Sequence, residues 1–319
     1  MLPCKRIELT FSEKTISNQR VNIEKSKEIL KELVHRFMPK PGDCEIGSLG
    51  VHIYRRDHPK QREITLYCPR IVKMIQGAKQ ATFGNETFCY GENDVMVMGV
   101  DMPGVCRMAD ASPENPCTAI SIDLNKNLIA QLAIEMPQRY FDTGTVNKGM
   151  LVQALDAELL DAFLRLAELF HRPERLPIIG PMIIREIHYL MLIGPNGHKL
   201  RSFYTLGFQN NKVAQAISWL KNNLAANIQI EELAKMVNMA PSTFHRHFKN
   251  VTALSPIQFQ KRLRLHEAQR LMLMNDFDAS SASAAVGYEN ISQFNREYKR
   301  LFGDPPRRNI ENITKRIMS

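Results

Sequence analysis

Residues 227–256, NIQIEELAKMVNMAPSTFHRHFKNVTALSP, decide the fold of the C-terminal part. Apolar residues at positions 233, 234 and 237 recur at helical spacing, and Phe244 and Phe248 lie one helical turn apart. Asn238 can adopt the left-handed conformation that ends a first helix, and Pro241 suits the first turn of a second helix. The stretch therefore predicts two short helices joined by a tight turn, a helix-turn-helix unit.

The pattern returns after a shift of 49 residues and, past one insertion, of 50. The second copy keeps the turn and the aromatic stripe, with Val286, Gly287, Phe294 and Tyr298 at the corresponding places. Between the copies, SPIQFQKRLRLHEAQRLMLM (255–274) has a cap at Ser255 and an apolar stripe at helical spacing. The sequence thus predicts two helix-turn-helix units on one long joining helix.

Charge is distributed unevenly along the chain. Residues 212–319 hold 16 Lys and Arg against 9 Asp and Glu, whereas residues 1–211 hold 26 against 24. Most of the formal net charge of +9 therefore lies in the final third. This asymmetry favours a polyanion as partner of the C-terminal part, although a merely soluble basic surface would give the same count.

The N-terminal part changes character along its length. After a helical opening (21–38), short β-rich segments follow between 45 and 123, interrupted by Gly, Asn and Pro every eight to twelve residues. These segments are 49–54, 62–68, 70–77, 80–85, 86–91, 94–100 and 117–124. They predict a small barrel or sandwich. Residues 126–204 return to a helical pattern, with the main helices expected at 151–170 and 181–192.

The 319 residues therefore predict an α+β chain of two domains, 1–206 and 212–312, with a linker near 207–211. The helices at 151–170 and 181–192 have apolar faces wide enough for both a core and a partner subunit. Leucines and a methionine crowd around them at Leu159, Leu160, Leu190, Met191 and Leu192. We therefore expect part of that surface to form a homodimer.

Several classes of function lack support in the sequence. There is no phosphate-cradling glycine loop, nucleophile elbow or carboxylate pair at a recognisable spacing, so no enzyme is expected. The six cysteines form no CxxC pair, and His52 and His58 do not make a metal-binding pattern, so neither metal nor cofactor is expected. A redox role for a cysteine stays open. No signal peptide or run of eighteen apolar residues is found, which predicts a cytoplasmic protein without a membrane partner.

Three stretches resemble the DNA-binding domain of AraC/XylS-family regulators: LAKMVNMAPSTFHRHFK (233–249), SPIQFQKRLRLHEAQRLM (255–272) and VGYENISQFNREYKRLFGDPP (286–306). The N-terminal part is similar to the family's sensor domain, a cupin-like β-barrel, through YCPRIVKMIQGAKQ (67–80), GENDVMVMGVDMP (91–103) and CTAISIDLN (117–125). This resemblance implies a sequence-specific DNA-binding transcription regulator, expected to be an activator, although no residue decides the direction of regulation. A joining helix of about 27 Å would suit two major-groove segments about 34 Å apart.

One place departs from the family pattern. The first helix of the second unit has Ala282 and Ser283 where an Ile-Ala pair is usual. Ala282 fills less of the local core than Ile would. The Ser283 hydroxyl must donate a hydrogen bond to its own helix, because an unsatisfied hydroxyl would lower the stability of the unit. We therefore expect the second unit to be the less rigid one.

By resemblance, the second helix of each unit contacts DNA. The implied set is Ser242, Thr243, His245, Arg246 and Lys249 in the first unit, and Ile291, Ser292, Gln293, Asn295, Arg296, Lys299 and Arg300 in the second. The chemistry agrees, because Arg can bind guanine through two hydrogen bonds, Gln or Asn can pair with adenine, and Ile can meet a thymine methyl group. Lys249, Lys299 and Arg300 are candidates for phosphate contacts.

The resemblance also implies a small-molecule pocket inside the barrel. Its candidate residues are Tyr54, Tyr67, Gln76, Lys79, Tyr90 and Met98, because such a pocket needs apolar walls with a few convergent polar groups. The expected partners are a double-stranded DNA operator, a small-molecule effector and a second copy of the chain. RNA polymerase is a further partner that the resemblance leaves open. The alternative function is that of a sequence-independent architectural DNA-binding protein.

Overall fold

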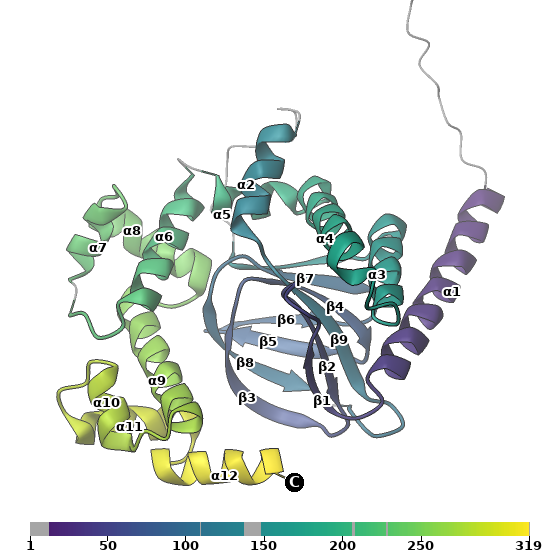
Figure 1. The fold of residues 1–319 in the computed structure, drawn as a ribbon. Helices are drawn as coiled ribbons and strands as arrows, with labels where there is room; N and C mark the ends of the chain where they lie inside the picture. Colours follow the sequence, from purple (N-terminus) through teal and green to yellow (C-terminus); the bar gives the residue numbers. More distant parts are fainter. Residues whose placement is uncertain (1–12, 109, 137–147, 206–207, 228, 319) are drawn as a thin grey trace, which may run out of the picture.

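The computed structural model describes residues 13–108, 110–136, 148–205, 208–227 and 229–318 (Figure 1). Its N-terminal elements are α1 (Glu13–Phe37), β1 (Gly42–Glu45), β2 (Val51–Arg56), β3 (Lys60–Tyr67), β4 (Arg70–Gln76), β5 (Lys79–Phe83), β6 (Glu86–Tyr90), β7 (Asp94–Met98), β8 (Met102–Met108), β9 (Cys117–Asp123), α2 (Lys126–Glu135), β10 (Met150–Ala154), α3 (Ala157–Leu169), α4 (Leu176–Ile193) and α5 (Gly197–Tyr204). The C-terminal elements are α6 (Gln209–Asn222), α7 (Ile230–Met236), α8 (Pro241–Thr252), α9 (Pro256–Met274), α10 (Ala279–Ala285), α11 (Ile291–Phe302) and α12 (Pro306–Met318). The chain is α+β, as the sequence predicts.

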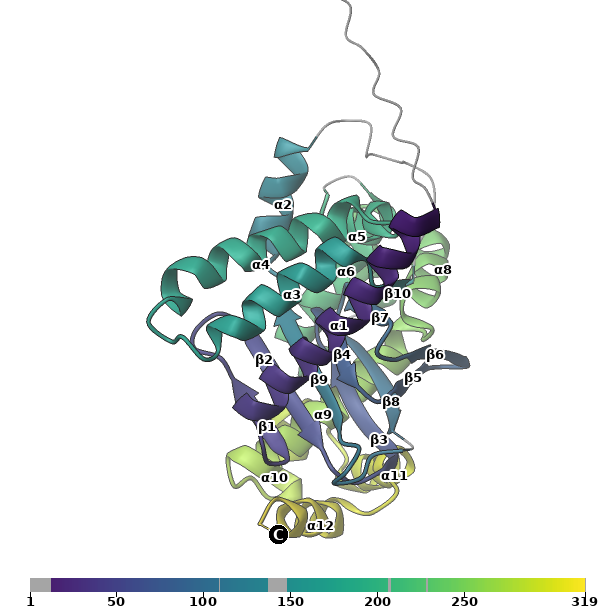
Figure 2. The same ribbon diagram turned by 90° about the vertical axis from the view of Figure 1, so that its right-hand side faces the viewer.

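The strands form two antiparallel sheets. One has the order β1-β2-β9-β4-β7-β10 and the other β3-β8-β5-β6. Because side chains alternate along a strand, Ile71 and Ile75 of β4 pack against the helices, whereas Met74 belongs to the core on the opposite face. Figure 2 shows α1, α3 and α4 lying over the outer face of the larger sheet. The smaller sheet faces its inner side.

The sequence predicts strands β2 to β7 and β9 correctly but misses β1, β8 and β10. The expected helix at 151–170 is wrong at its start, because Met150–Ala154 pairs with β7 as an edge strand. Asp156 then caps α3, its side chain accepting a hydrogen bond from the Leu159 backbone N–H at 2.8 Å. The helix expected at 181–192 begins earlier, at Leu176, and contains Pro181 within it.

The linker expected near 207–211 is shorter than predicted, because α6 already begins at Gln209. Asn210 and Asn211 are buried rather than solvated. Their amides donate to the Ser202 hydroxyl at 2.7 Å and to the Phe203 carbonyl at 2.9 Å. These bonds fasten the first helix of the C-terminal part to α5.

The residues expected at a dimer interface are mostly core residues. Leu159 and Leu160 are each 1% exposed and Leu192 is fully buried, so their side chains are used within the chain. The opposite side of α4 instead exposes Ile178, Ile179, Met182 and Tyr189. Among the described helices, α4 has the length and composition of a membrane span, but part of it lies in the core.

The buried apolar residues form three clusters that do not follow the two-domain division. The first lies between the larger sheet and its helices. The second runs from the space between the sheets, at Met74 and Phe83, into the first helix-turn-helix unit, at Phe244 and Phe248. The third lies within the second unit and the C-terminal half of α9. The first unit is therefore packed onto the N-terminal part, whereas the second has a core of its own.

Candidate nucleic-acid interface

The two predicted helix-turn-helix units are α7–α8 and α10–α11. Their first helices bury corresponding positions, which are Leu233, Ala234 and Val237 in one and Ala282, Ser283 and Val286 in the other. Their second helices repeat the pattern of buried and exposed residues almost position for position at a shift of 50 residues. The internal repeat found in the sequence is thus a repeat of structure.

Left-handed residues make both turns. Asn238 has φ 53° and Gly287 has φ 84°, as the sequence predicts for Asn238. The next residue of each turn donates its backbone N–H back to the first helix, Met239 to Ala234 at 2.9 Å and Tyr288 to Ser283 at 2.9 Å. These bonds satisfy carbonyls at the helix end and fix the angle at which the second helix leaves.

Ser283 is accommodated as expected. Its side chain is 3% exposed, and its hydroxyl donates to the Ser280 carbonyl within the same helix at 2.8 Å. The hydroxyl is therefore satisfied without a partner from another element. The difference from the family pattern therefore costs stability only through the smaller side chain that Ala282 contributes to the core.

Aromatic pairs hold the second helix of each unit against its core. The ring centroids of Phe244 and Phe248 are 5.4 Å apart, and those of Phe294 and Tyr298 are 5.5 Å apart. All four side chains are fully buried. The opposite face of each helix is consequently turned to solvent.

The residues expected to contact DNA lie on these outward faces. Thr243 is half-buried, and the rest are exposed: Ser242, His245, Arg246, Lys249, Ile291, Ser292, Gln293, Asn295, Arg296, Lys299 and Arg300. Gln293 also donates to the Glu297 carboxylate at 3.1 Å, so its amide is partly engaged within α11. The structure thus brings each predicted set together on a single helix face.

The cations on these faces are Arg246, Lys249, Arg296, Lys299 and Arg300. Within the described residues none of them forms an ion pair or a side-chain hydrogen bond. Neighbouring cations behave differently, because Lys261 pairs with Glu297 at 2.6 Å and Arg270 with Glu267 at 2.8 Å. The outward helix faces therefore carry positive charge that is not paired with any carboxylate of the described residues.

The joining helix α9 serves both units. Ser255 caps it through a capping box with Gln258. Phe259 and Leu263 belong to the core of the first unit, and Leu265 and Ala268 to the core of the second. One straight element thus carries both units.

Arg264, which sequence reasoning did not single out, ties the units together. Its guanidinium donates to the carbonyls of Leu224 at 2.7 Å and Ala226 at 3.1 Å, in the segment between α6 and α7, and to Gly287 at 3.1 Å in the second turn. Gly287 also packs against Ala225, where a Cβ would lie 2.7 Å from the Ala225 Cα. The sign of it in the sequence is the run KRLRL (261–265), in which Arg262 and Arg264 alternate with leucines.

The six effector candidates lie on strand faces turned to the space between the two sheets. Lys79 lies over the Tyr54 ring, with Nζ 5.7 Å from its centroid, and pairs in register with Tyr90. Burial and the nearby Tyr90 raise the pKa of Tyr67. Met98 is fully buried. The candidates therefore all face the core between the sheets. The contacts join Tyr54, Lys79 and Tyr90, but they do not join all six residues into one group.

Two polar groups in that core bear on binding. The Tyr54 hydroxyl accepts hydrogen bonds from Arg70 and from the Ser121 hydroxyl. The Gln76 amide donates to Asn115, while its Oε1 is buried without a partner among the described residues.

No group of three His, Cys, Asp or Glu suited to a metal occurs in the part of the chain that the structure describes.

Comparison with known proteins finds two family models. Residues 49–199 match the AraC-type transcriptional regulator N-terminus, and residues 233–311 match a helix-turn-helix domain. The chain is 29% identical over 99 residues to the HTH-type transcriptional activator RhaS of Yersinia pestis (strain Pestoides F), which is 31% of this chain and 36% of the relative. It is also 29% identical over 110 residues to the uncharacterized HTH-type transcriptional regulator YobQ of Bacillus subtilis, covering 34% of this chain and 45% of that one. The matches therefore span less than half of these relatives.

The fold as a whole is similar to ToxT of Vibrio cholerae. One ToxT structure aligns with a TM-score of 0.56 at 11% identity, over 82% of this chain and 97% of ToxT. An apo ToxT variant from strain SCE256 aligns with a TM-score of 0.55 at 10% identity, over 83% and 98% of the two chains. The sensor-domain model thus matches the N-terminal part and the helix-turn-helix model matches the C-terminal part. Together these matches support an AraC-family transcriptional regulator with an N-terminal sensor domain.

Proposed function

We propose that this protein is a sequence-specific DNA-binding transcription regulator whose N-terminal domain senses a small molecule. The observation that carries the proposal is the structural repeat, in which two helices attached to one joining helix expose cations that have no protein partner among the described residues. Residues 212–312 form the DNA-binding domain in this proposal, and residues 1–206 form the sensor. The protein acts in the cytoplasm on a double-stranded operator and catalyses no reaction. RNA polymerase is its proposed partner when it activates transcription.

The proposed effector site lies between the two sheets. The unsatisfied Gln76 oxygen and the Lys79 ammonium supply polar groups there, among apolar side chains such as Met98. A ToxT structure holds an unsaturated fatty acid, which supports a small-molecule effector for this chain. Effector binding would shift the population of sensor arrangements and thereby change how the reading helices meet DNA.

Arg246→Ala is expected to weaken binding to a selected operator by about 1–3 kcal/mol and to relax the preference at one base pair. The Arg246 side chain is exposed and unpaired, so the change breaks no contact within the described chain. Fluorescence anisotropy with an operator selected from a random-duplex library measures the effect. Lys249→Ala, the phosphate candidate, should weaken operator and random duplex alike.

Competition with random duplex separates this proposal from the architectural alternative. A sequence-specific regulator should prefer its selected site by about a thousandfold or more at physiological salt. An architectural protein would show no such preference. Equal losses on operator and random DNA for Arg246→Ala would also contradict the assignment of base contacts.

We also propose a homodimer, formed through the exposed face of α4 rather than through the leucines expected from the sequence. Ile178 and Met182 are 66% and 62% exposed and lie one turn apart. Met182→Asp should convert the dimer to a monomer in sedimentation equilibrium at micromolar concentration, while leaving the fold unchanged. Met274→Asp, at an equally exposed site on α9, is the matched control. A wild-type protein that is monomeric with and without operator would contradict the dimer.

A further inference from the structure

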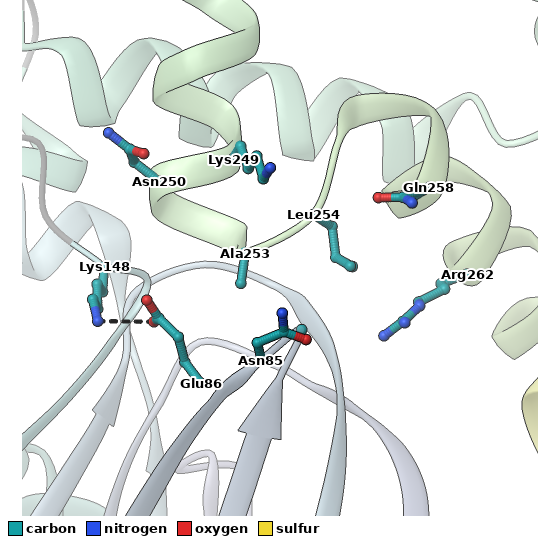
Figure 3. Close-up of a pocket in the computed structure, with 10 residues that line it drawn as sticks. Asn85, Glu86, Lys148, Lys249, Asn250, Ala253, Leu254, Gln258 and Arg262 are labelled. Atoms are coloured by element: carbon teal, nitrogen blue, oxygen red, sulfur yellow. Dashed lines mark ion pairs between the residues drawn. The ribbon is translucent and has the colours of Figure 1, made fainter.

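A cavity of about 840 Å³ opens between the smaller sheet and the first helix-turn-helix unit (Figure 3). The β5–β6 turn and Lys148 form one wall, and the end of α8 and the start of α9 form the other. The walls touch at two points. Gly149 donates its N–H to the Val251 carbonyl at 2.9 Å, and a Cβ at Gly84 would lie 2.7 Å from the Ala253 oxygen. The cavity is thus bounded by both parts of the chain and held in shape by direct contact.

Positive charge dominates the lining. Figure 3 shows Lys148, Lys249 and Arg262 around the cavity. The lining contains one carboxylate, that of Glu86, which is already paired with Lys148 at 2.9 Å. The remaining two cations have no protein counter-ion among the described residues.

Arg262 is the most informative of these side chains. It is half-buried, and its guanidinium forms no ion pair or hydrogen bond within the described residues. Its neighbour Arg264, two residues along α9, is instead satisfied by three carbonyls. The Arg262 guanidinium nitrogens still reach solvent, so an anion in the cavity can bind them without displacing a protein partner.

We propose that this cavity binds a small organic dianion, a phosphate monoester or a dicarboxylate, through Arg262 and Lys249. A guanidinium binds the oxygens of either group through two parallel hydrogen bonds, and the ammonium adds a second point of charge. The amides of Asn85 and Gln258 lie on the same lining and supply neutral donors. Apart from Ala253 and Leu254, the lining side chains are polar or charged, so a polar molecule suits the cavity better than a long hydrocarbon chain.

The regulatory part of the inference rests on the proposed function. Lys249 is both a lining residue of the cavity and a candidate for a DNA phosphate contact. A bound dianion would compete with the operator for this ammonium and weaken DNA binding. By linkage, operator DNA must weaken dianion binding by the same factor.

Isothermal titration of the DNA-free, full-length protein tests the site independently of DNA binding. Inorganic phosphate, succinate and glycerol are titrated at constant ionic strength. One of the two dianions should bind with a stoichiometry of one per chain, and glycerol should not. The dianion that binds identifies the chemistry as phosphate or dicarboxylate.

Three variants decide whether the cavity is the site. Arg262→Gln and Lys249→Gln should each weaken the dianion by about tenfold or more, because each removes a charge-assisted hydrogen bond. Arg270→Gln, on the same helix but paired with Glu267, should stay within about twofold of wild type. Circular dichroism checks that the variants fold. Neither substitution removes a side-chain hydrogen bond or ion pair within the described residues.

Absence of binding by both dianions, or unchanged binding in Arg262→Gln, would overturn the site. If Arg262→Gln lowers affinity for random duplex while no dianion binds, the cavity belongs to the DNA backbone and the inference is wrong. If the dianion binds but leaves operator affinity unchanged, the site stands and its regulatory role does not.

Discussion

Arg264→Ala is expected to destabilise the C-terminal domain by about 2–4 kcal/mol and to weaken binding to an operator that carries both half-sites. The guanidinium is the donor to three backbone carbonyls, two before α7 and one in the turn of the second unit. Each bond from a charged donor contributes about 1.5–3 kcal/mol, and the carbonyls left behind are only partly rehydrated. Urea denaturation followed by circular dichroism measures the loss of stability.

Arg270→Ala is the matched control for this prediction. Arg270 lies on the same helix, but its only partner among the described residues is Glu267, three positions away on the surface. Its loss should cost less than about 0.5 kcal/mol. Operators whose half-site spacing differs by a few base pairs add a second readout: wild type should discriminate between them, and Arg264→Ala should discriminate less. Equal losses of stability in the two variants would refute the role of Arg264 in joining the units.

Gly287→Ala is expected to cost about 2–4 kcal/mol. The residue has φ 84°, a conformation that costs an alanine about 1–2 kcal/mol. In addition, the new Cβ would lie 2.7 Å from the Cα and 2.8 Å from the carbonyl oxygen of Ala225, and backbone cannot move aside as a side chain can. The second unit would have to shift away from the segment that follows α6.

Gly303→Ala separates the two terms. Gly303 has φ 91°, but nothing lies within 4 Å of the Cβ position. Its replacement should therefore show the backbone strain alone, about 1–2 kcal/mol. Thermal unfolding of both variants gives the difference, which reports the close approach at Ala225. No difference would mean that the second unit adjusts freely.

The C-terminal fold was predictable because its signals are local and occur twice. A left-handed turn residue and an aromatic pair one helical turn apart fix each unit within a short stretch of chain. The edge strand β10 was not predictable in this way. Residues 150–154 continue into a helical pattern, and only pairing with β7, far away in sequence, makes them a strand. Likewise β8 contains Gly104, which reads as a turn residue but leaves room for the Phe83 ring.

In the candidate site, too, the features set by local sequence were predictable and those set by long-range contacts were not. The outward positions of α8 and α11 follow from the helical period once Phe244 and Phe294 are known to be buried. The role of Arg264 could not be predicted, because its acceptors are backbone carbonyls that only the folded chain brings together. The cationic cavity also joins residues from both parts of the chain, such as Lys148 and Arg262. The effector candidates were chosen because a pocket needs apolar walls with a few polar groups, and their role stays a prediction.

The apolar core between the sheets continues into the first helix-turn-helix unit. The boundary between folding units therefore lies within α9, and not at the linker expected near 207–211. Heat or denaturant that loosens the sheets must also loosen α8 and the N-terminal half of α9, since they share one cluster. The second unit has its own core and is expected to unfold separately, which would break α9 near its middle, the bonds of Arg264 and the packing of Gly287 against Ala225. An effector bound between the sheets, as proposed, would therefore act on the first unit through shared packing, and on the second unit through α9 and the contacts of Arg264 and Gly287.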